Sequence, residues 1–135
     1  MNSDSLVITR EQLREMKNHA ESLAPLEACG LLAGKNDRVE KVILVRNQAE
    51  SPVRFVMNPR DQLKAFDWID SNGLDLLAIF HSHPAGLETA SPTDIAEAAY
   101  DVVHLILSRN ERGWKARGFW IERGDSVEVS IKIVE

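Results

Sequence analysis

The sequence predicts a single domain of mixed helix and strand, of the α/β (α+β) class, covering residues 1–135, and three observations lead to this class. A chain of 135 residues suits one ordinary domain. Hydrophobic residues make up 44% and charged residues 27%, the balance of a folded globular protein. Segments with helical spacing of apolar residues are interspersed with short apolar or alternating segments, which predicts helices packed on a sheet.

The first half of the chain predicts two helices and two or three strands. Thr9 followed by Gln12 is a capping box, and Asn58 followed by Pro59 is typical of a helix start. The predicted elements are a helix over 9–23, strands over 28–34 and 39–47, a short possible strand "VRFV" over 53–56, and a helix over 59–71.

The second half predicts a buried central strand, a third helix and three more strands. Residues 74–83, "LDLLAIFHSH", are nearly continuous in apolar residues before the histidines, as in a strand covered on both faces. The remaining predicted elements are a helix over 91–100 and strands over 102–108, 114–122 and 126–135.

Charge and cysteine content narrow the class of protein. The 16 Lys+Arg against 21 Asp+Glu give a net charge of −5 without any basic block, which disfavours nucleic-acid binding. Cys29 is the single cysteine, so no intrachain disulfide or thiolate zinc cage is expected. The first ten residues show no secretory signal, and no apolar run approaches the ~18 residues of a membrane span. The sequence predicts a cytoplasmic protein with no membrane partner, and it leaves the oligomeric state open.

The segment "AIFHSHPAGLETASPTD" carries the residues typical of a metal site. On a strand, His81 and His83 point to the same face, where two imidazoles can reach one metal ion. Ser91 is a good N-cap, and Asp94 lies in the first turn of the helix that follows. Two histidines and one carboxylate leave a position open for water, as in catalytic zinc sites. The alternative is that "SPTD" only begins a helix.

The whole pattern resembles the JAMM/MPN+ (Mov34/MPN/PAD-1) zinc metalloprotease family, in its prokaryotic stand-alone form. The matching residues are an upstream glutamate within "PLEACGLLAG", then H-x-H-P, then a serine and an aspartate at the family's offsets: Glu27, His81, His83, Pro84, Ser91 and Asp94. The resemblance implies a curved, mixed, mostly antiparallel sheet flanked by helices, similar to cytidine deaminases. Deaminase activity itself requires a P-C-x-x-C pair that this chain lacks.

The resemblance also implies a role for each site residue. One Zn²⁺ is expected on His81, His83, Asp94 and a water molecule. Glu27 is expected to act as general base and then to protonate the leaving amine, and Ser91 to donate a hydrogen bond to the oxyanion. Without the resemblance, Glu27 would be interpreted as a solvated strand-end residue. The other carboxylates considered for the base are Glu88, in the loop between the ligands, and Glu97, on the helix.

The implied substrate is the C-terminal Gly-Gly tail of a ubiquitin-like or sulfur-carrier protein, cleaved at the amide or isopeptide bond that follows it. The tail is expected to lie extended against a sheet edge, for which we expected residues 51–56, "SPVRFV". Two other functions remain open at this point: a catalytically silent scaffold, and a zinc hydrolase of small peptides without a carrier protein.

Overall fold

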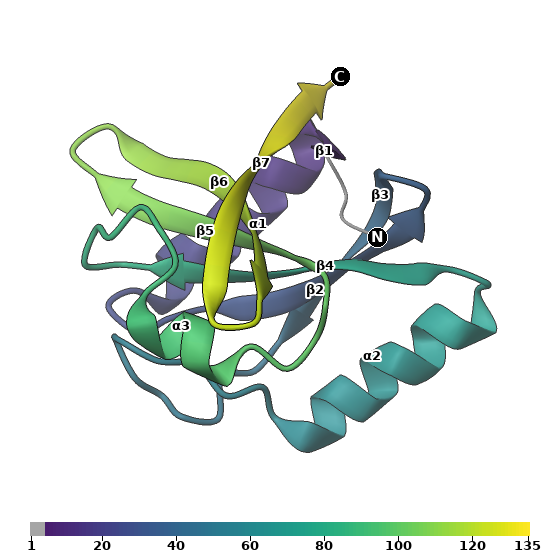
Figure 1. Ribbon diagram of the computed structural model, residues 1–135, viewed down its shortest axis with the longest axis horizontal. Coiled ribbons are helices and arrows are strands. Elements are labelled where there is room, and N and C mark those ends of the chain that lie inside the picture. The colour runs from purple at the N-terminus through teal and green to yellow at the C-terminus, as the bar shows by residue number, and fades with distance from the viewer. Residues whose placement is uncertain (1–4) are drawn as a thin grey trace.

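The computed structural model describes residues 5–135, which form seven strands and three helices (Figure 1). In chain order they are β1 (Ser5–Thr9), α1 (Arg10–Leu23), β2 (Cys29–Lys35), β3 (Arg38–Val45), α2 (Pro59–Ser71), β4 (Asp75–His83), α3 (Pro92–Glu97), β5 (Val103–Asn110), β6 (Gly113–Glu122) and β7 (Asp125–Val134). The mixed α+β class is confirmed.

The strands form one closed, mixed sheet in the order β1-β3-β2-β4-β5-β6-β7. The pairs β2–β3, β2–β4, β5–β6 and β6–β7 are antiparallel, whereas β4–β5, β1–β7 and β1–β3 are parallel. β1 and β3 meet only at Val7 and Arg38, so the closure is weakest there. This confirms a curved, mixed and mostly antiparallel sheet.

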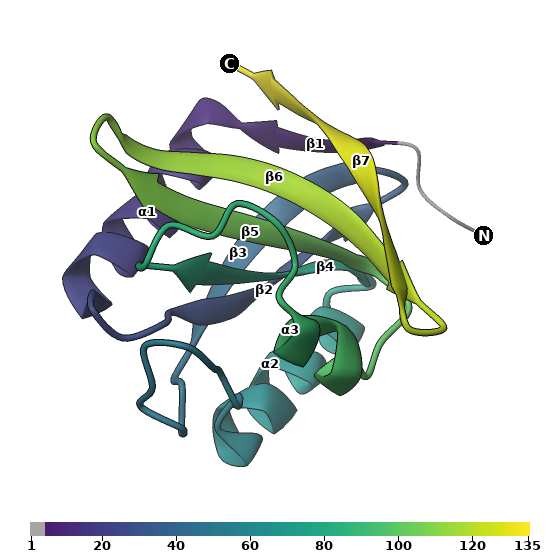
Figure 2. The same ribbon diagram turned by 60° about the vertical axis from the view of Figure 1, so that its left-hand side comes forward.

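Apolar side chains on the sheet form three hydrophobic clusters, of which the two larger ones are each built around one helix. Met16 and Ala20 of α1 pack in a cluster to which all seven strands contribute apolar side chains, so the sheet curls around this helix. Ala65 and Ile69 of α2 pack on the outer face against β2, β3 and β4. Figure 2 shows α2 and α3 near one another and away from α1.

The alternation along β4 decides which face receives the histidines. Ala78 and Phe80 belong to the α1 core, and Ile79 belongs to the α2 core. Because side chains alternate along a strand, His81 and His83 continue on the side of Ile79. The central strand therefore carries both imidazoles to the outer face, where α2 and α3 lie.

The helix starts follow the sequence prediction closely. The Thr9 hydroxyl accepts from the Gln12 N–H at 3.0 Å, and the Gln12 side chain accepts from the Thr9 N–H at 2.9 Å, which confirms the capping box. Asn58 accepts from the Asp61 N–H at 3.0 Å, and α2 covers the predicted residues 59–71. α3 begins after Ser91 as predicted but ends at Glu97, three residues before the predicted end.

Two predictions about strands are wrong. Residues 53–56 form no strand, because the only ladder contact in this region is an isolated bridge between Asn47 and Met57. A sheet edge at residues 51–56 for an extended tail is therefore absent from the described structure. Conversely, β1 was not predicted, since its partners β3 and β7 lie far along the chain and leave no local pattern.

No helix within residues 5–135 is both long enough and apolar enough to cross a membrane. The expectation that residues 1–10 carry no secretory signal rests partly on residues 1–4, which lie outside the described range.

Candidate metal centre

The end of β4 is anchored by two hydrogen bonds to Ala28, the residue before β2. The Ser82 hydroxyl, which points away from the two histidines, accepts from the Ala28 N–H at 2.7 Å, and the Ser82 N–H donates to the Ala28 carbonyl at 3.0 Å. His81 is fully buried and His83 is 5% exposed. The strand end is thus rigid at the point where the imidazoles leave it.

The loop after β4 fixes the protonation of His83. The Gly86 N–H donates to the His83 carbonyl at 3.0 Å, and the positive φ of Gly86, 97°, turns the chain back over the strand end. The Leu87 carbonyl then lies 2.8 Å from Nδ1 of His83. A carbonyl can only accept, so Nδ1 carries the hydrogen and the neutral ring presents the lone pair of Nε2 to the interior.

Asp94 is held at the start of α3 by a second capping box. Its backbone N–H donates to the Ser91 hydroxyl oxygen at 3.0 Å, and the Ser91 N–H donates to Asp94 Oδ2 at 2.8 Å. The same Oδ2 lies 3.1 Å from Nε2 of His81 and 3.0 Å from Nε2 of His83. The helix start therefore delivers one carboxylate oxygen to both imidazoles, as the spacing of the motif predicts.

These three atoms fit the ligand set of a metal ion. The two Nε2 atoms are themselves 3.0 Å apart, so two imidazole nitrogens and a carboxylate oxygen face one another in a buried triangle. Three acceptor-capable atoms this close together are compatible only with a hydrogen or a metal ion between them. Ligands of tetrahedral zinc stand about 3.3 Å apart for bonds of about 2.0–2.1 Å. The triangle matches that spacing to within a few tenths of an ångström.

The electrostatics agree with a site for a cation. Burial by itself would raise the pKa of Asp94, but its close contacts with the imidazoles of His81 and His83 outweigh it and hold this pKa well below the usual range. Burial lowers the pKa of His81. For His83, burial is outweighed by the contacts with Asp94 and the Leu87 carbonyl, and its pKa is raised. The carboxylate remains charged, and the centre carries negative charge for a cation to neutralise.

Glu27 lies beside the triangle and is not the solvated residue that its sequence position alone would favour. It is 2% exposed, and its carboxylate, His81 and His83 offer ligand atoms within 4.8 Å of one another. Its Oε1 finds no hydrogen-bond partner among residues 5–135. Burial raises its pKa to about 8, an effect that His83 reduces and Asp94 reinforces. Glu27 therefore joins the metal-binding group from a greater distance than Asp94.

The other two carboxylates considered at the sequence level lie outside this group. Glu97 pairs with Arg54 at 2.8 Å on the surface. Glu88 lies 3.3 Å from the Lys115 ammonium and 3.5 Å from the Arg117 guanidinium. Both are committed to exposed ion pairs, so the structure favours Glu27 as the carboxylate beside the histidines.

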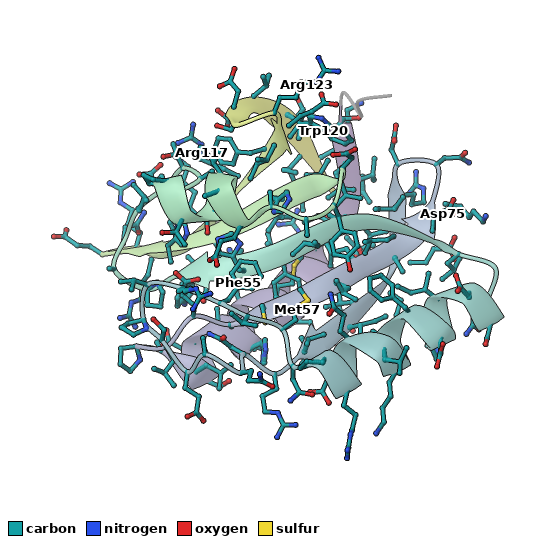
Figure 3. All side chains as sticks on the ribbon, turned by 60° about the horizontal axis from the view of Figure 1, so that its bottom comes forward. Phe55, Met57, Asp75, Arg117, Trp120 and Arg123 are labelled. Carbon is teal, nitrogen blue, oxygen red and sulfur yellow. The ribbon has the colours of Figure 1, made fainter. Side chains whose placement is uncertain are left out.

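Two cavities open next to the centre. One, of about 240 Å³, is lined by Glu27, His83 and Ser91 together with Pro52, Val53, Ala85, Leu87 and Thr93. The other, of about 320 Å³, has Asp94 in its wall and is otherwise mostly apolar, with Phe55 and Met57 among its lining residues (Figure 3). The centre is thus reachable from a pocket that also holds the candidate base and the serine hydroxyl.

Two features of the site leave no recognisable pattern in the sequence. The Phe55 ring stacks on the His81 imidazole, with centroids 4.5 Å apart and an angle of 25° between the planes. The Leu87 carbonyl holds Nδ1 of His83. Neither feature has a motif, because one depends on an irregular loop and the other on a main-chain oxygen.

Comparison with known protein families supplies the family of this chain. Residues 9–121 match Prok-JAB, the prokaryotic homologs of the JAB domain, and the chain belongs to this family. The resemblance identified from Glu27, His81, His83, Ser91 and Asp94 is thereby confirmed at the level of the family.

Three curated relatives bear names of cleaving enzymes. A probable TtuB-protein conjugate cleaving protease of Thermus thermophilus is 36% identical over 93% of this chain and 82% of its own length. A desampylase of Pyrococcus furiosus is 36% identical over 96% of this chain and 90% of its own. A CysO-cysteine peptidase of Mycobacterium bovis is 31% identical over 96% of this chain and 92% of its own.

Solved structures confirm the fold. The solution structure of a protein from Desulfitobacterium hafniense superimposes with a TM-score of 0.88 at 35% identity, covering 96% of this chain and 93% of that one. A JAB1/MPN domain protein from Archaeoglobus fulgidus gives a TM-score of 0.62 at 23% identity, covering 96% of this chain and all of that one.

Proposed function

We propose that this protein is a zinc-dependent hydrolase that cleaves the amide or isopeptide bond after the C-terminal Gly-Gly tail of a ubiquitin-like or sulfur-carrier protein. Relatives of nearly the same length are named for cleaving TtuB conjugates, for desampylation and for acting on CysO-cysteine. We place the activity in the cytoplasm, where a chain whose single cysteine is free and buried is stable in its reduced form.

The observation that carries the proposal is the buried triangle of Nε2 of His81, Nε2 of His83 and Oδ2 of Asp94, with edges of 3.0–3.1 Å. We assign these three atoms as the protein ligands of one Zn²⁺, with a water molecule as the fourth. When bound, zinc supplies the Lewis acidity that ionises water near neutral pH, with a pKa of about 7.

Glu27 is suited to move the proton. Its carboxylate lies within reach of the histidines, has a free oxygen among the described residues, and has a pKa of about 8 in the metal-free protein. A base poised near the working pH can accept a proton from the attacking water and return it to the leaving amine. The burial of Glu27 raises the pKa of its carboxyl group in the metal-free protein, so this group accepts a proton more readily than an exposed glutamate does.

Ser91 can act as helix cap and as oxyanion donor at the same time. Capping uses the hydroxyl oxygen as the acceptor of the Asp94 N–H, so the hydroxyl hydrogen stays available for donation. This hydroxyl lines the cavity of about 240 Å³ that also contains Glu27 and His83. We assign it to the carbonyl oxygen on which negative charge develops in the transition state.

We assign the same cavity to the Gly-Gly end of the tail. Pro52, Val53 and Leu87 narrow it from two loops, and a residue without a side chain passes such a slot most easily. Since residues 51–56 form no strand, the tail is held here by the cavity walls and not by a ladder along that segment.

The test begins with the metal content of the purified protein, followed by cleavage of a carrier protein fused through its Gly-Gly tail to a reporter. We expect one zinc per chain and hydrolysis after the second glycine, with loss of cleavage when the tail ends in Ala-Ala. Bound zinc without cleavage of any fusion would favour a small-peptide hydrolase. A protein without metal under replete conditions would favour a scaffold.

A further inference from the structure

The side chain of Asn47 uses all of its hydrogen-bonding capacity inside the protein. It is 6% exposed and lies two residues after the end of β3. Its Nδ2 donates to the carbonyls of Glu27 at 3.0 Å and Arg54 at 3.1 Å, and its Oδ1 accepts from the N–H groups of Ala49 and Val56, each at 3.0 Å. Two donors and two acceptors are the full complement of this amide, and the partners fix its orientation.

One of these bonds holds the main chain of the candidate base. The Glu27 carbonyl accepts from Asn47, and the Glu27 N–H donates to the Ser51 carbonyl at 2.8 Å. β2 begins only at Cys29, so Glu27 lies outside the named ladders of the sheet. Both of its main-chain polar groups are instead bound by the loop that follows β3.

Two other bonds hold the residues on either side of Phe55. The Arg54 carbonyl and the Val56 N–H both bind Asn47, so the amide brackets Phe55 in the chain. The ring of Phe55 stacks on the His81 imidazole at a centroid distance of 4.5 Å. Main-chain bonds from the Gln48 N–H to the Val56 carbonyl at 2.7 Å and from the Asn58 N–H to the Arg46 carbonyl at 2.9 Å close the loop, and the Asn47 amide adds four bonds inside it.

We propose that Asn47 is a positioning residue for hydrolysis, because one buried amide sets the place of the Glu27 carboxylate and of the Phe55 ring over His81. The assignment of Glu27 as base rests on the function proposed above. Removing the amide deletes the bond to the Glu27 carbonyl and both bonds that flank Phe55, so the base and the wall over the metal ligand shift relative to one another. Supporting groups of this kind typically contribute about 10–100-fold in activity or metal affinity.

The experiment compares Asn47→Ala and Asn47→Asp with Gln12→Ala in the zinc-loaded protein. Gln12 is a matched control: its amide donates to the Val39 carbonyl at 2.9 Å and accepts from the Thr9 N–H at 2.9 Å, and it is attached to α1, on the other side of the sheet. Asn47→Asp keeps the two accepting positions and loses both donors when ionised. We measure kcat and KM for a diglycine fusion, the Kd for Zn²⁺, and the melting temperature.

We expect both Asn47 variants to lose about 10–100-fold in kcat, with KM changed less than about threefold, and to bind Zn²⁺ about 3–10-fold more weakly. Gln12→Ala should melt at a lower temperature with unchanged kcat and Kd. Asn47 variants that are folded and match wild type in kcat and in Kd would overturn the proposal, as would an equal loss of kcat in Gln12→Ala.

Two further outcomes are also decisive. If neither Asn47 variant folds, Phe55→Leu is measured in their place. Weaker Zn²⁺ binding by Phe55→Leu than by wild type supports the proposal, and unchanged binding overturns it. If wild type cleaves no diglycine fusion, the proposed function fails, and Zn²⁺ affinity alone judges the role of Asn47. Weaker binding in Asn47→Ala than in Gln12→Ala then supports positioning, and equal binding refutes it.

Discussion

Replacing Glu27 with glutamine should change activity and stability in opposite directions. The substitution keeps the shape of the side chain and leaves His81, His83 and Asp94 in place, so zinc should remain bound. Without a proton acceptor, kcat should fall by about 10²–10⁴-fold, or about 3–5 kcal/mol in the barrier.

The gain in stability follows from the pKa of Glu27, which burial raises from 4.5 to about 8. The folded, metal-free protein keeps this carboxyl protonated, whereas the unfolded chain releases the proton above pH 4.5. The unfolded state therefore binds fewer protons, and stability falls as pH rises from 4.5 to 8. At pH 7 the loss is up to about 3 kcal/mol, at 1.36 kcal/mol per pKa unit. A glutamine avoids this loss.

The assays are zinc content, turnover of a diglycine fusion, and urea unfolding in chelator at pH 5 and pH 7.5. Glu27→Gln should gain stability relative to wild type at pH 7.5 and little at pH 5. Glu88→Gln, which removes only an exposed partner of Lys115 and Arg117, is the control and should keep zinc and activity. A Glu27→Gln protein with full turnover, or with a stability difference independent of pH, would refute this reasoning.

Three further changes test the rest of the site and the core. Asp94→Asn should weaken zinc binding by an order of magnitude or more, because it removes the negative charge from the oxygen shared by both imidazoles. Isothermal titration measures this affinity, and an unchanged affinity would exclude Asp94 as a ligand. Ser91→Ala should lower the free energy of unfolding by about 1 kcal/mol through the lost helix cap, and it should lower kcat by about 10²–10³-fold. A variant with a reduced melting temperature and an unchanged kcat would leave Ser91 only the capping role. His104→Leu should make the free energy of unfolding less sensitive to acid. Burial and the charge of His81 lower the pKa of His104 from 6.5 to about 4. The unfolded chain therefore binds a proton at a higher pH than the folded protein, and stability is lost as pH falls from 6.5 to 4. Parallel pH–stability curves for wild type and His104→Leu would contradict this.

The sequence predicts those parts of the fold that depend on interactions between residues close together in the chain. Thr9 with Gln12 and Asn58 with Pro59 mark helix starts because the side chains that cap a helix are its immediate neighbours. The two-residue period of β4 likewise directs His81 and His83 to one face, which is visible without a structure.

What the sequence does not predict depends on contacts between distant segments. The "VRFV" segment has the composition of a strand, but its main-chain groups bind the Asn47 amide instead of a neighbouring strand. The burial of Glu27 is equally invisible, since it arises from a loop some twenty residues further along the chain. For this residue the family resemblance supplied what the spacing of the residues could not.

The parallel pairing of β1 with β7, in which Ser5 faces Ser130 and Thr9 faces Val134, has a consequence for biosynthesis. The sheet cannot close until β7 has left the ribosome, because Ser5 and its partner Ser130 lie 125 positions apart along the chain. Contacts of such high sequence separation slow folding. During translation, the edge of β1 that pairs with β7 therefore remains without its partner strand until β7 has been synthesised.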